Sequence, residues 1–314
     1  MKPPMQVISS GDGVAASLRG GVVALGNFDG FHAGHQAVVG RALARARAEG
    51  RPALVATFDP HPAKLFKPDA PPFALTRLDQ KLELLERFGI DATVVMPFDR
   101  AFAAQSAPDF VNDWLSRRIG AAVAVSGADF TFGTKRSGDT ASLAALGQQL
   151  GIAAEVVQAI SDSDGVISST RIRQALQAGD VATATKLLTR PFALRGVVQH
   201  GAKLGRTLGF PTANLLVGDY LRPKFGVYAV RARLSDGSSV GGVANLGIRP
   251  MIEPPLELLE AFLFDWAGDL YGTTIDVELV GFIRPEWKLD GLEALKAQIA
   301  LDTNEARRLL ILDK

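Results

Sequence analysis

Two histidines in the first half of the chain have a spacing that suits phosphate chemistry. His32 and His35 lie in the glycine-rich segment 26–36, directly after a short apolar run. Residues three apart at the start of a helix face the same side, and a helix N-terminus attracts anions. Two such imidazoles can stabilise charge on a phosphoryl oxygen as pyrophosphate leaves. The alternatives are two structural histidines or a metal pair, for which His61, His200 or carboxylates would have to supply the further ligands.

A second glycine-rich segment, residues 201–214, reads Gly-Ala-Lys-Leu-Gly-Arg-Thr-Leu-Gly-Phe-Pro-Thr-Ala-Asn. Its spacing is not that of a P-loop, and Pro211 would block the helix that must follow one. Successive backbone amides can still form a nest that binds an anion. The segment therefore predicts another phosphate site, and a glycine-rich turn before an asparagine-capped strand is the structural alternative.

The elements that must position the first-half residues form a strand–helix alternation. Short, nearly continuous apolar runs are typical of parallel strands covered on both faces, and the helical stretches between them are long enough to cross over. This pattern predicts an open α/β sheet, in which ligands bind beyond the carboxyl ends of the strands. The predicted strands cover residues 22–25, 53–58, 92–96 and 121–125, and the predicted helices cover residues 36–48, 78–88 and 108–119.

In the second half, apolar and polar residues alternate, as in antiparallel strands that are buried on one face. Residues 227–234 alternate and run into Asp236-Gly237, a strong hairpin signal, and residues 274–280 alternate again. We therefore expect a small antiparallel barrel or sandwich.

The domain boundary and the tail can also be predicted. A helical segment at 180–188 followed by Pro191 indicates a boundary near residues 185–192, which gives one domain over 1–186 and another over 187–314. The tail carries an apolar helical stripe, in which Asp302 followed by Glu305 predicts the cap of a new helix.

The composition excludes several classes of protein. With 47% hydrophobic and 21% charged residues, the chain can build sizeable cores and is not disordered. Its net charge of +1 gives no signal for a nucleic-acid or membrane partner, and we predict neither. The arginine-rich run 41–51 could be a nucleic-acid patch, but beside alanines and a glutamate on a helix it is interpreted as a solvated face. The lack of cysteine excludes disulfides and thiolate catalysis. Without a signal peptide or a long apolar run, we expect a cytoplasmic protein.

The first-half motifs resemble those of bacterial FMN adenylyltransferases, in the nucleotidyltransferase superfamily. His-Ala-Gly-His at 32–35 is similar to the HxGH signature, and Ile-Ser-Ser-Thr-Arg-Ile-Arg at 167–173 is similar to an ISSTxxR-like signature. Segments 57–62 and 127–133 resemble parts that line the ATP and flavin sites. Taken alone, the serines could be plain helix caps and the aspartates plain turn caps. The resemblance implies phosphate stabilisation by His32, His35 and Arg171, ATP binding by Gly26, Asn27, Phe28, Asp29, Gly34, Ser168, Ser169 and Thr170, and flavin binding by Asp59, Asp129 and Phe130.

The second-half motifs resemble the riboflavin kinase signature GxxxGRxxGxPTAN, followed in order by matches at 226–228, 242–250 and 269–272. Two features differ from many members: segment 251–256 is short where a longer loop could help to cover riboflavin, and Phe262 replaces a common histidine. The resemblance implies ATP binding by Gly201, Lys203, Gly205 and Arg206, Mg²⁺ placement by Thr212 and Asn214, flavin binding by Asn245 and Arg249, and catalysis by Glu260, whose carboxylate can accept the proton of the ribityl hydroxyl.

Together these motifs identify the chain as a member of the bifunctional bacterial riboflavin kinase/FMN adenylyltransferases. The implied fold is an N-terminal Rossmann-like nucleotidyltransferase sheet with a C-terminal antiparallel β-barrel kinase domain. The implied reactions use ATP and Mg²⁺ to convert riboflavin to FMN, and a second ATP to convert FMN to FAD; a weak homo-oligomer is left open. The alternatives are another nucleotidyltransferase, a chain whose kinase half only binds flavin, and an RNA-binding regulator that uses the barrel.

Overall fold

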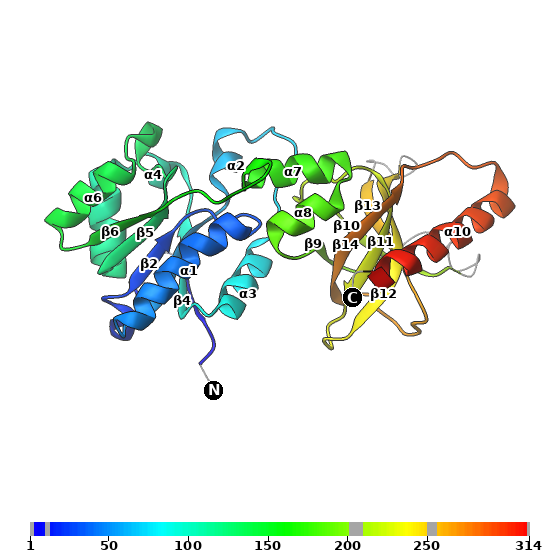
Figure 1. The fold of residues 1–314 in the computed structure, drawn as a ribbon, viewed down its shortest axis with the longest axis horizontal. Helices are drawn as coiled ribbons and strands as arrows, with labels where there is room; N and C mark the ends of the chain where they lie inside the picture. The colour runs from blue at the N-terminus through cyan, green and yellow to red at the C-terminus, as the bar shows by residue number, and fades with distance from the viewer. Residues whose placement is uncertain (1–2, 10–12, 201–209, 250–255, 313–314) are drawn as a thin grey trace. The chain divides into compact units, whose positions relative to one another are not determined.

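The computed structural model describes residues 3–9, 13–200, 210–249 and 256–312. These residues form two compact units. The N-terminal unit comprises Met1–Ala70 and Leu78–Ser168, and the C-terminal unit comprises Pro71–Arg77 and Ser169–Lys314 (Figure 1). Each unit is built around its own sheet.

The sheet of the N-terminal unit has six strands in the order β1-β4-β3-β2-β5-β6, and every neighbouring pair is parallel. The predicted parallel α/β sheet is therefore confirmed. The next two strands along the chain, β3 and β4, lie on one side of β2, whereas β5 and β6 lie on its other side. The strand order therefore reverses between β2 and β5. The strands are β1 (Gln6–Ser9), β2 (Val22–Leu25), β3 (Ala53–Asp59), β4 (Ala92–Pro97), β5 (Val123–Gly127) and β6 (Ala153–Val157).

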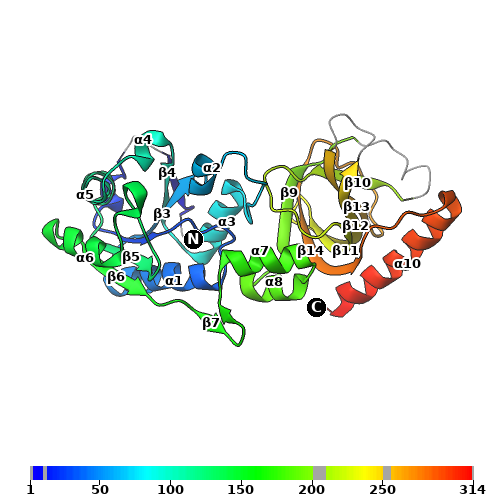
Figure 2. The same cartoon turned by 90° about the horizontal axis from the view of Figure 1, so that it is seen from above.

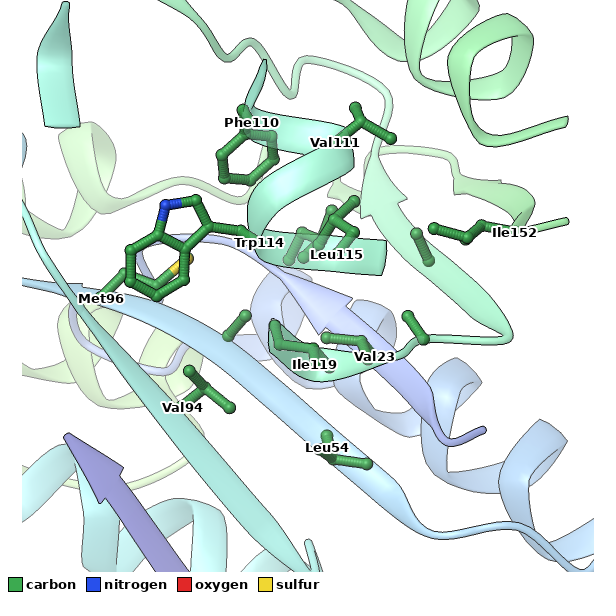
Figure 3. Packing of buried hydrophobic residues seen from close by; sticks show 14 of the residues in the cluster. Val23, Leu54, Val94, Met96, Phe110, Val111, Trp114, Leu115, Ile119 and Ile152 are labelled. Atoms are coloured by element: carbon green, nitrogen blue, oxygen red, sulfur yellow. The ribbon is translucent and has the colours of Figure 1, made fainter. Parts of the chain in front are cut away.

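Helices cover both faces of this sheet, and the alternation of side chains along β2 shows how. Val22 and Ala24 pack in the cluster that contains residues of α1 and α3, whereas Val23 and Leu25 pack in the cluster that contains Trp114 of η2 (Figure 3). Both faces of the sheet are therefore shielded from solvent, as expected for a parallel sheet. The helices are α1 (Ala33–Ala48), α2 (Pro62–Phe66), α3 (Leu78–Phe88), α4 (Arg100–Ala103), α5 (Ala107–Asp109), η2 (Phe110–Ile119) and α6 (Thr140–Gln149), with short turns η1 (Ala16–Leu18) and η3 (Thr134–Arg136) and a small hairpin of β7 (Ser161–Asp162) and β8 (Gly165–Val166).

The sheet of the C-terminal unit is antiparallel throughout, in the order β10-β13-β12-β11-β14-β9. It curls until its two edges meet at a bridge between Gln199 and Asn214, which confirms the expected barrel (Figure 2). Asp236-Gly237 forms the predicted hairpin turn between β11 and β12, with Gly237 at a φ of 85°. The elements are α7 (Ser169–Ala178), α8 (Val181–Leu188), β9 (Phe192–Val197), β10 (Thr212–Leu216), β11 (Gly226–Arg233), β12 (Ser239–Arg249), β13 (Leu256–Leu263), β14 (Thr274–Arg284) and α10 (Gly291–Leu312).

The tail is one continuous helix, α10, so the predicted new helix cap at Asp302 is wrong. The carboxylate of Asp302 bonds instead to Arg284 of β14, at 2.9 Å to Nε and 2.6 Å to a terminal guanidinium nitrogen, and to Gln298. Because both carboxylate oxygens of Asp302 bond to these side chains, they do not cap the helix backbone. The Asp302–Arg284 pair fixes α10 against the outer face of the barrel. Within the described ranges, no helix has both the length and the apolar character needed to cross a membrane.

Candidate active sites

The loop between β2 and α1, residues 26–32, lies where the strand order of the N-terminal unit reverses. In open α/β sheets, this switch point at the carboxyl ends of the strands is where ligands bind. The loop has a fixed shape, because Phe28 and Phe31 are both 2% exposed and both have positive φ, at 53° and 40°. Non-glycine residues hold such values only where the surrounding packing imposes them, which is common at functional sites.

His32 and His35 lie together at the start of α1. His32 is the N-cap of this helix, and its Nδ1 accepts the backbone N–H of His35 at 3.4 Å. The two rings are stacked, with centroids 3.7 Å apart and planes inclined by 20°. Gly34 leaves room for this pair, because a Cβ at Gly34 would lie 3.1 Å from Cε1 of His32. The predicted geometry of two imidazoles on one side of a helix N-terminus is therefore present.

A buried polar triangle supports the same loop. Lys81 of α3 donates from Nζ to the carbonyl oxygen of Asn27 at 2.9 Å and to Oγ1 of Thr57 at 3.2 Å. Thr57 of β3 donates its hydroxyl to the same Asn27 oxygen at 3.0 Å. Lys81 was not predicted from the sequence, although its position four residues before the buried Leu85 puts it on the inner side of α3, where a lysine is unusual.

The other residues predicted for this site come from neighbouring strand ends. Leu25 of β2 is in register with both Ala56 of β3 and Ser126 of β5, so the three strands end at the same edge. Asp59 is the last residue of β3 and is exposed, and Asp129 and Phe130 lie in the turn after β5. Gly26 and Asp29 belong to the 26–32 loop itself, in which Asp29 is 4% exposed and a Cβ at Gly26 would meet the Phe28 ring at 2.8 Å.

The predicted serine–threonine–arginine motif falls at the boundary of the two units. Ser168 is the last residue of the N-terminal unit, and Ser169, Thr170 and Arg171 form the first turn of α7 in the C-terminal unit. α7 begins at Ser169, so a helix does start at these serines, as the helix-cap alternative requires.

A second constellation spans three neighbouring strands of the barrel. Glu260 of β13 is in register with Asn214 of β10 on one side and with Asn245 of β12 on the other. Residues directly opposite one another in an antiparallel pair point to the same face, so these three side chains lie in a row. Thr212 lies two residues before Asn214 and shares that face. Phe262 lies on it too, opposite Thr212, and packs in the cluster with Ala306 of α10.

Glu260 is held by an arginine. Arg249 of β12 donates from Nε to Oε2 of Glu260 at 3.1 Å, and it also approaches Glu286 at 3.5 Å. Burial alone would lower the pKa of Arg249, but its hydrogen bonds and ion pairs with Glu260 and Glu286 outweigh burial and raise the pKa. Arg249 is therefore a permanent cation next to the carboxylate.

The side-chain amide oxygen of Asn245 can accept a hydrogen bond from a ligand. Its Nδ2 donates to Oε1 of Glu286 at 3.0 Å, whereas its Oδ1 is buried without a hydrogen-bond partner among the described residues. A buried acceptor without a donor is costly, so an N–H or O–H group of a bound molecule would satisfy it. Glu286 was not predicted from the sequence. A Cβ at Gly247 would lie 2.2 Å from Glu286 Oε1, so this glycine makes room for the carboxylate.

The donor set of the barrel fits a magnesium ion bound together with a nucleotide. No cluster of three or more histidines or carboxylates that could hold a metal occurs in the described part of the chain. Mg²⁺, however, usually takes only one or two protein oxygens and keeps phosphates and waters as its other ligands. Thr212 and Asn214 offer such oxygens side by side, and Nδ2 of Asn214 donates to the carbonyl of Thr212 at 3.3 Å, which turns Oδ1 the other way.

Some predicted residues cannot be placed. Gly201, Lys203, Gly205 and Arg206 lie outside the described residues, as does most of the short segment that follows Arg249. Their predicted roles in ATP binding stay predictions.

The comparisons with known proteins match both halves of the chain. The family described as FAD synthetase matches residues 14–171, and the family described as riboflavin kinase matches residues 188–310. Two relatives called bifunctional riboflavin kinase/FMN adenylyltransferase, from Escherichia coli and Bacillus subtilis, are 41% and 39% identical. The first alignment covers 95% of this chain and 96% of the relative, and the second covers 91% and 92%.

Among solved structures, one from Streptococcus pneumoniae, titled as a macrolide-efflux protein, has a TM-score of 0.86 at 31% identity. The match covers 96% of this chain and 99% of that one, so the two share their whole fold. Because the alignments with both bifunctional relatives run through both units, the chain belongs to the bifunctional riboflavin kinase/FMN adenylyltransferase family.

Proposed function

We propose that the chain makes FAD in two steps at two separate sites: the barrel phosphorylates riboflavin to FMN, and the parallel sheet adenylylates FMN to FAD. The observation that carries this proposal is the consecutive match of both families, each over one half of the chain. Each half also contains polar side chains gathered where its fold binds ligands: the stacked histidines at the switch point, and the row around Glu260.

In the kinase step, Glu260 is the base. Its carboxylate accepts the proton of the riboflavin 5′-hydroxyl while that oxygen attacks the γ-phosphorus of ATP, and the bond to the β-phosphate oxygen breaks, which releases ADP. Asn245 contacts the flavin through its buried Oδ1, and Arg249 orients the Glu260 carboxylate. Gly201, Lys203, Gly205 and Arg206 bind the phosphates of ATP. Mg²⁺ held at Thr212 and Asn214 would offset charge on these phosphates.

In the adenylylation step, an oxygen of the FMN phosphate attacks the α-phosphorus of ATP, and the bond to pyrophosphate breaks. No protein nucleophile is needed, so the protein contributes alignment and electrostatic stabilisation. His32, His35 and Arg171 stabilise the phosphates, and Asp59, Asp129 and Phe130 contact the flavin. The nucleotide is held by Gly26, Asn27, Phe28, Asp29, Gly34, Ser168, Ser169 and Thr170.

The functional division of the chain belongs to this proposal. We assign residues 1–186 to adenylylation and residues 187–314 to the kinase. A cytoplasmic location, a weak homo-oligomer and the absence of a nucleic-acid partner remain predictions.

The test is chromatography of the flavins formed by the purified protein with ATP and Mg²⁺. Starting from riboflavin, we expect FMN and FAD, and starting from FMN, we expect FAD. FAD from FMN alone would limit the proposal to the adenylylation half. No conversion in either reaction would contradict the proposal as a whole.

A further inference from the structure

Lys81 is a buried charge that the two reactions described above do not use. Its side chain belongs to α3, outside every motif that carries the family resemblance, and the residue is 6% exposed. Removing a lysine from water disfavours its charged form, and burial accordingly lowers the pKa of Lys81, while the carboxylates of Asp29 and Asp59 act in the opposite direction. An apolar side chain of similar length would fill the same space without that cost.

The contacts of the Lys81 ammonium group explain why this buried position holds a cation. Its Nζ reaches the carbonyl oxygen of Asn27, in the first part of the 26–32 loop, at 2.9 Å. The hydroxyl of Thr57 donates to the same oxygen, so that one carbonyl has two donors from two different elements. Two residues of this loop, Phe28 and Phe31, have positive φ, so the loop keeps its shape only where its surroundings fix it.

The loop continues directly into the histidine pair. His32 ends the loop and caps α1, and the ring of His35 meets Phe28 edge-on with centroids 5.4 Å apart. A shift of the Asn27 carbonyl would therefore move Phe28, and with it the support of the His35 ring. Lys81 also lies near Asp29 and Asp59, whose negative charges would otherwise repel the triphosphate and the FMN phosphate at this edge of the sheet.

We infer that Lys81 is a positioning residue for adenylyl transfer: it fixes the Asn27 carbonyl, and so the loop that carries His32 and His35, and its charge offsets Asp29 and Asp59 beside the anionic substrates. This inference rests on the proposed adenylylation site. Lys81 acts through the loop and is assigned no contact with ATP or flavin.

The experiment compares Lys81→Met, which keeps the bulk but neither charge nor donor, with Lys81→Gln, which keeps an N–H donor without the charge. Thr93→Val is the control, because Thr93 of β4 is also buried in this unit but its hydroxyl bonds to Met5 and not to the loop. For each full-length variant, kcat and the KM for ATP are measured for FAD formation from FMN, together with FMN formation from riboflavin and the melting temperature.

We expect Lys81→Met to lower the kcat of FAD formation roughly 10- to 100-fold and to raise the KM for ATP, with the kinase rate unchanged. Lys81→Gln should recover part of kcat but not the KM, because it restores the donor and not the charge. Thr93→Val should leave both constants within roughly twofold. Thr57→Val should lower kcat less than Lys81→Met, and the double variant should fall short of the product of the two single effects, because both donors serve one carbonyl.

The outcomes separate the possible failures. If the wild-type protein forms no FAD from FMN, the proposed function fails first. If the wild type is active and the Lys81 variants melt earlier but keep both constants, Lys81 is only structural and the inference is wrong. Should Lys81→Met fail to fold, Lys81→Gln decides alone: an unchanged KM for ATP overturns the inference, and a raised KM with a normal kinase rate supports it.

Discussion

Arg249 and Glu260 form an ion pair on adjacent strands of the barrel, with Nε 3.1 Å from Oε2. The pair is partly shielded, with side-chain exposures of 25% and 29%. Glu286 approaches the same guanidinium from the segment after β14, so one cation is shared by two carboxylates. In the proposed kinase site, this arrangement fixes the direction of the Glu260 carboxylate before substrate binds, which is the preorganisation that phosphoryl transfer requires.

Replacing Glu260 by glutamine should remove the base and keep the shape of the site. We expect FMN formation from riboflavin to fall roughly 100-fold or more, as is typical for the loss of a general base. Glu257→Gln is the matched control, because Glu257 lies on the same strand in an ion pair with Arg222. Its kinase rate should stay within roughly threefold of the wild type, as expected for a charge outside the reaction. Equal losses in both variants would indicate a general effect on β13.

The reciprocal variant is His35→Ala. It should reduce FAD formation from FMN roughly 100-fold, because a donor that stabilises phosphoryl charge is lost, and FMN formation from riboflavin should continue. Both rates are measured on the same preparation, so each reaction is the folding control of the other. A folded variant of either residue that loses both activities would contradict the assignment of two separate sites.

Gly34 should tolerate no side chain, although it lies in a helix. A Cβ there would lie 3.1 Å and 3.2 Å from Cε1 and Nδ1 of His32, and the ring would have to move from its stacked position. We expect Gly34→Ala to slow FAD formation at least roughly tenfold, because the two imidazoles lose their alignment. Gly40→Ala is the control on the same helix, where the new Cβ has its nearest contact at 3.6 Å from the Phe88 ring. It should leave the rate unchanged, and a similar loss there would mean that α1 itself is perturbed.

The fold could be predicted from the sequence wherever the hydrophobic pattern was strong. The bounds of β2 and α3 are those predicted, because a run of four buried apolar residues and a regular helical stripe leave little ambiguity. β1 and β6 were missed. Both are sheet edges with mostly exposed or half-buried residues, so neither shows the continuous apolar run that marked the central strands.

The candidate site could be predicted only as far as its motifs reached. The histidine pair and the Asn214–Glu260 neighbours come from recognisable motifs, whereas Lys81 is 54 residues from its partner Asn27 and meets it only in the folded sheet. The sequence did contain one signal, a lysine on the apolar side of a predicted helix. The partner of such a lysine depends on strand order, which periodicity does not reveal.

Glu155 should contribute a pH-dependent stability to the N-terminal unit. Burial would raise the pKa of this β6 carboxyl, but hydrogen bonds from Arg41 and Arg45 of α1 outweigh burial and lower it. A lowered pKa in the folded state gives stability that is present above the ordinary value and is lost as the pH falls through the folded value. We expect Glu155→Gln to cost about 1 kcal/mol at pH 7, since Arg41 is half exposed.

Urea unfolding between pH 7 and pH 3 measures this effect. The difference between Glu155→Gln and the wild type should shrink as the pH falls, because the wild-type carboxyl becomes protonated too. Glu83→Gln, which affects an exposed pair with Arg87 at 3.7 Å, should show a much smaller difference at every pH. A constant difference for Glu155→Gln would mean that packing, and not charge, explains its contribution.

Asp302 should be essential for the stability of the C-terminal unit, because it is the only carboxylate that an ion pair joins to Arg284 among the described residues. The two side chains are 5% and 11% exposed, so Asp302→Ala would leave a buried guanidinium without its counterion. Breaking a buried pair in this way typically costs about 3 kcal/mol. Glu305→Ala removes an exposed pair with Arg308 on the same helix and should lower the stability much less. In the double variant Asp302→Ala/Arg284→Met no charge is left buried, so thermal unfolding should show partial recovery relative to Asp302→Ala. If the double variant is no more stable than the single one, the loss comes from the packing of α10 on the barrel and not from the unpaired charge.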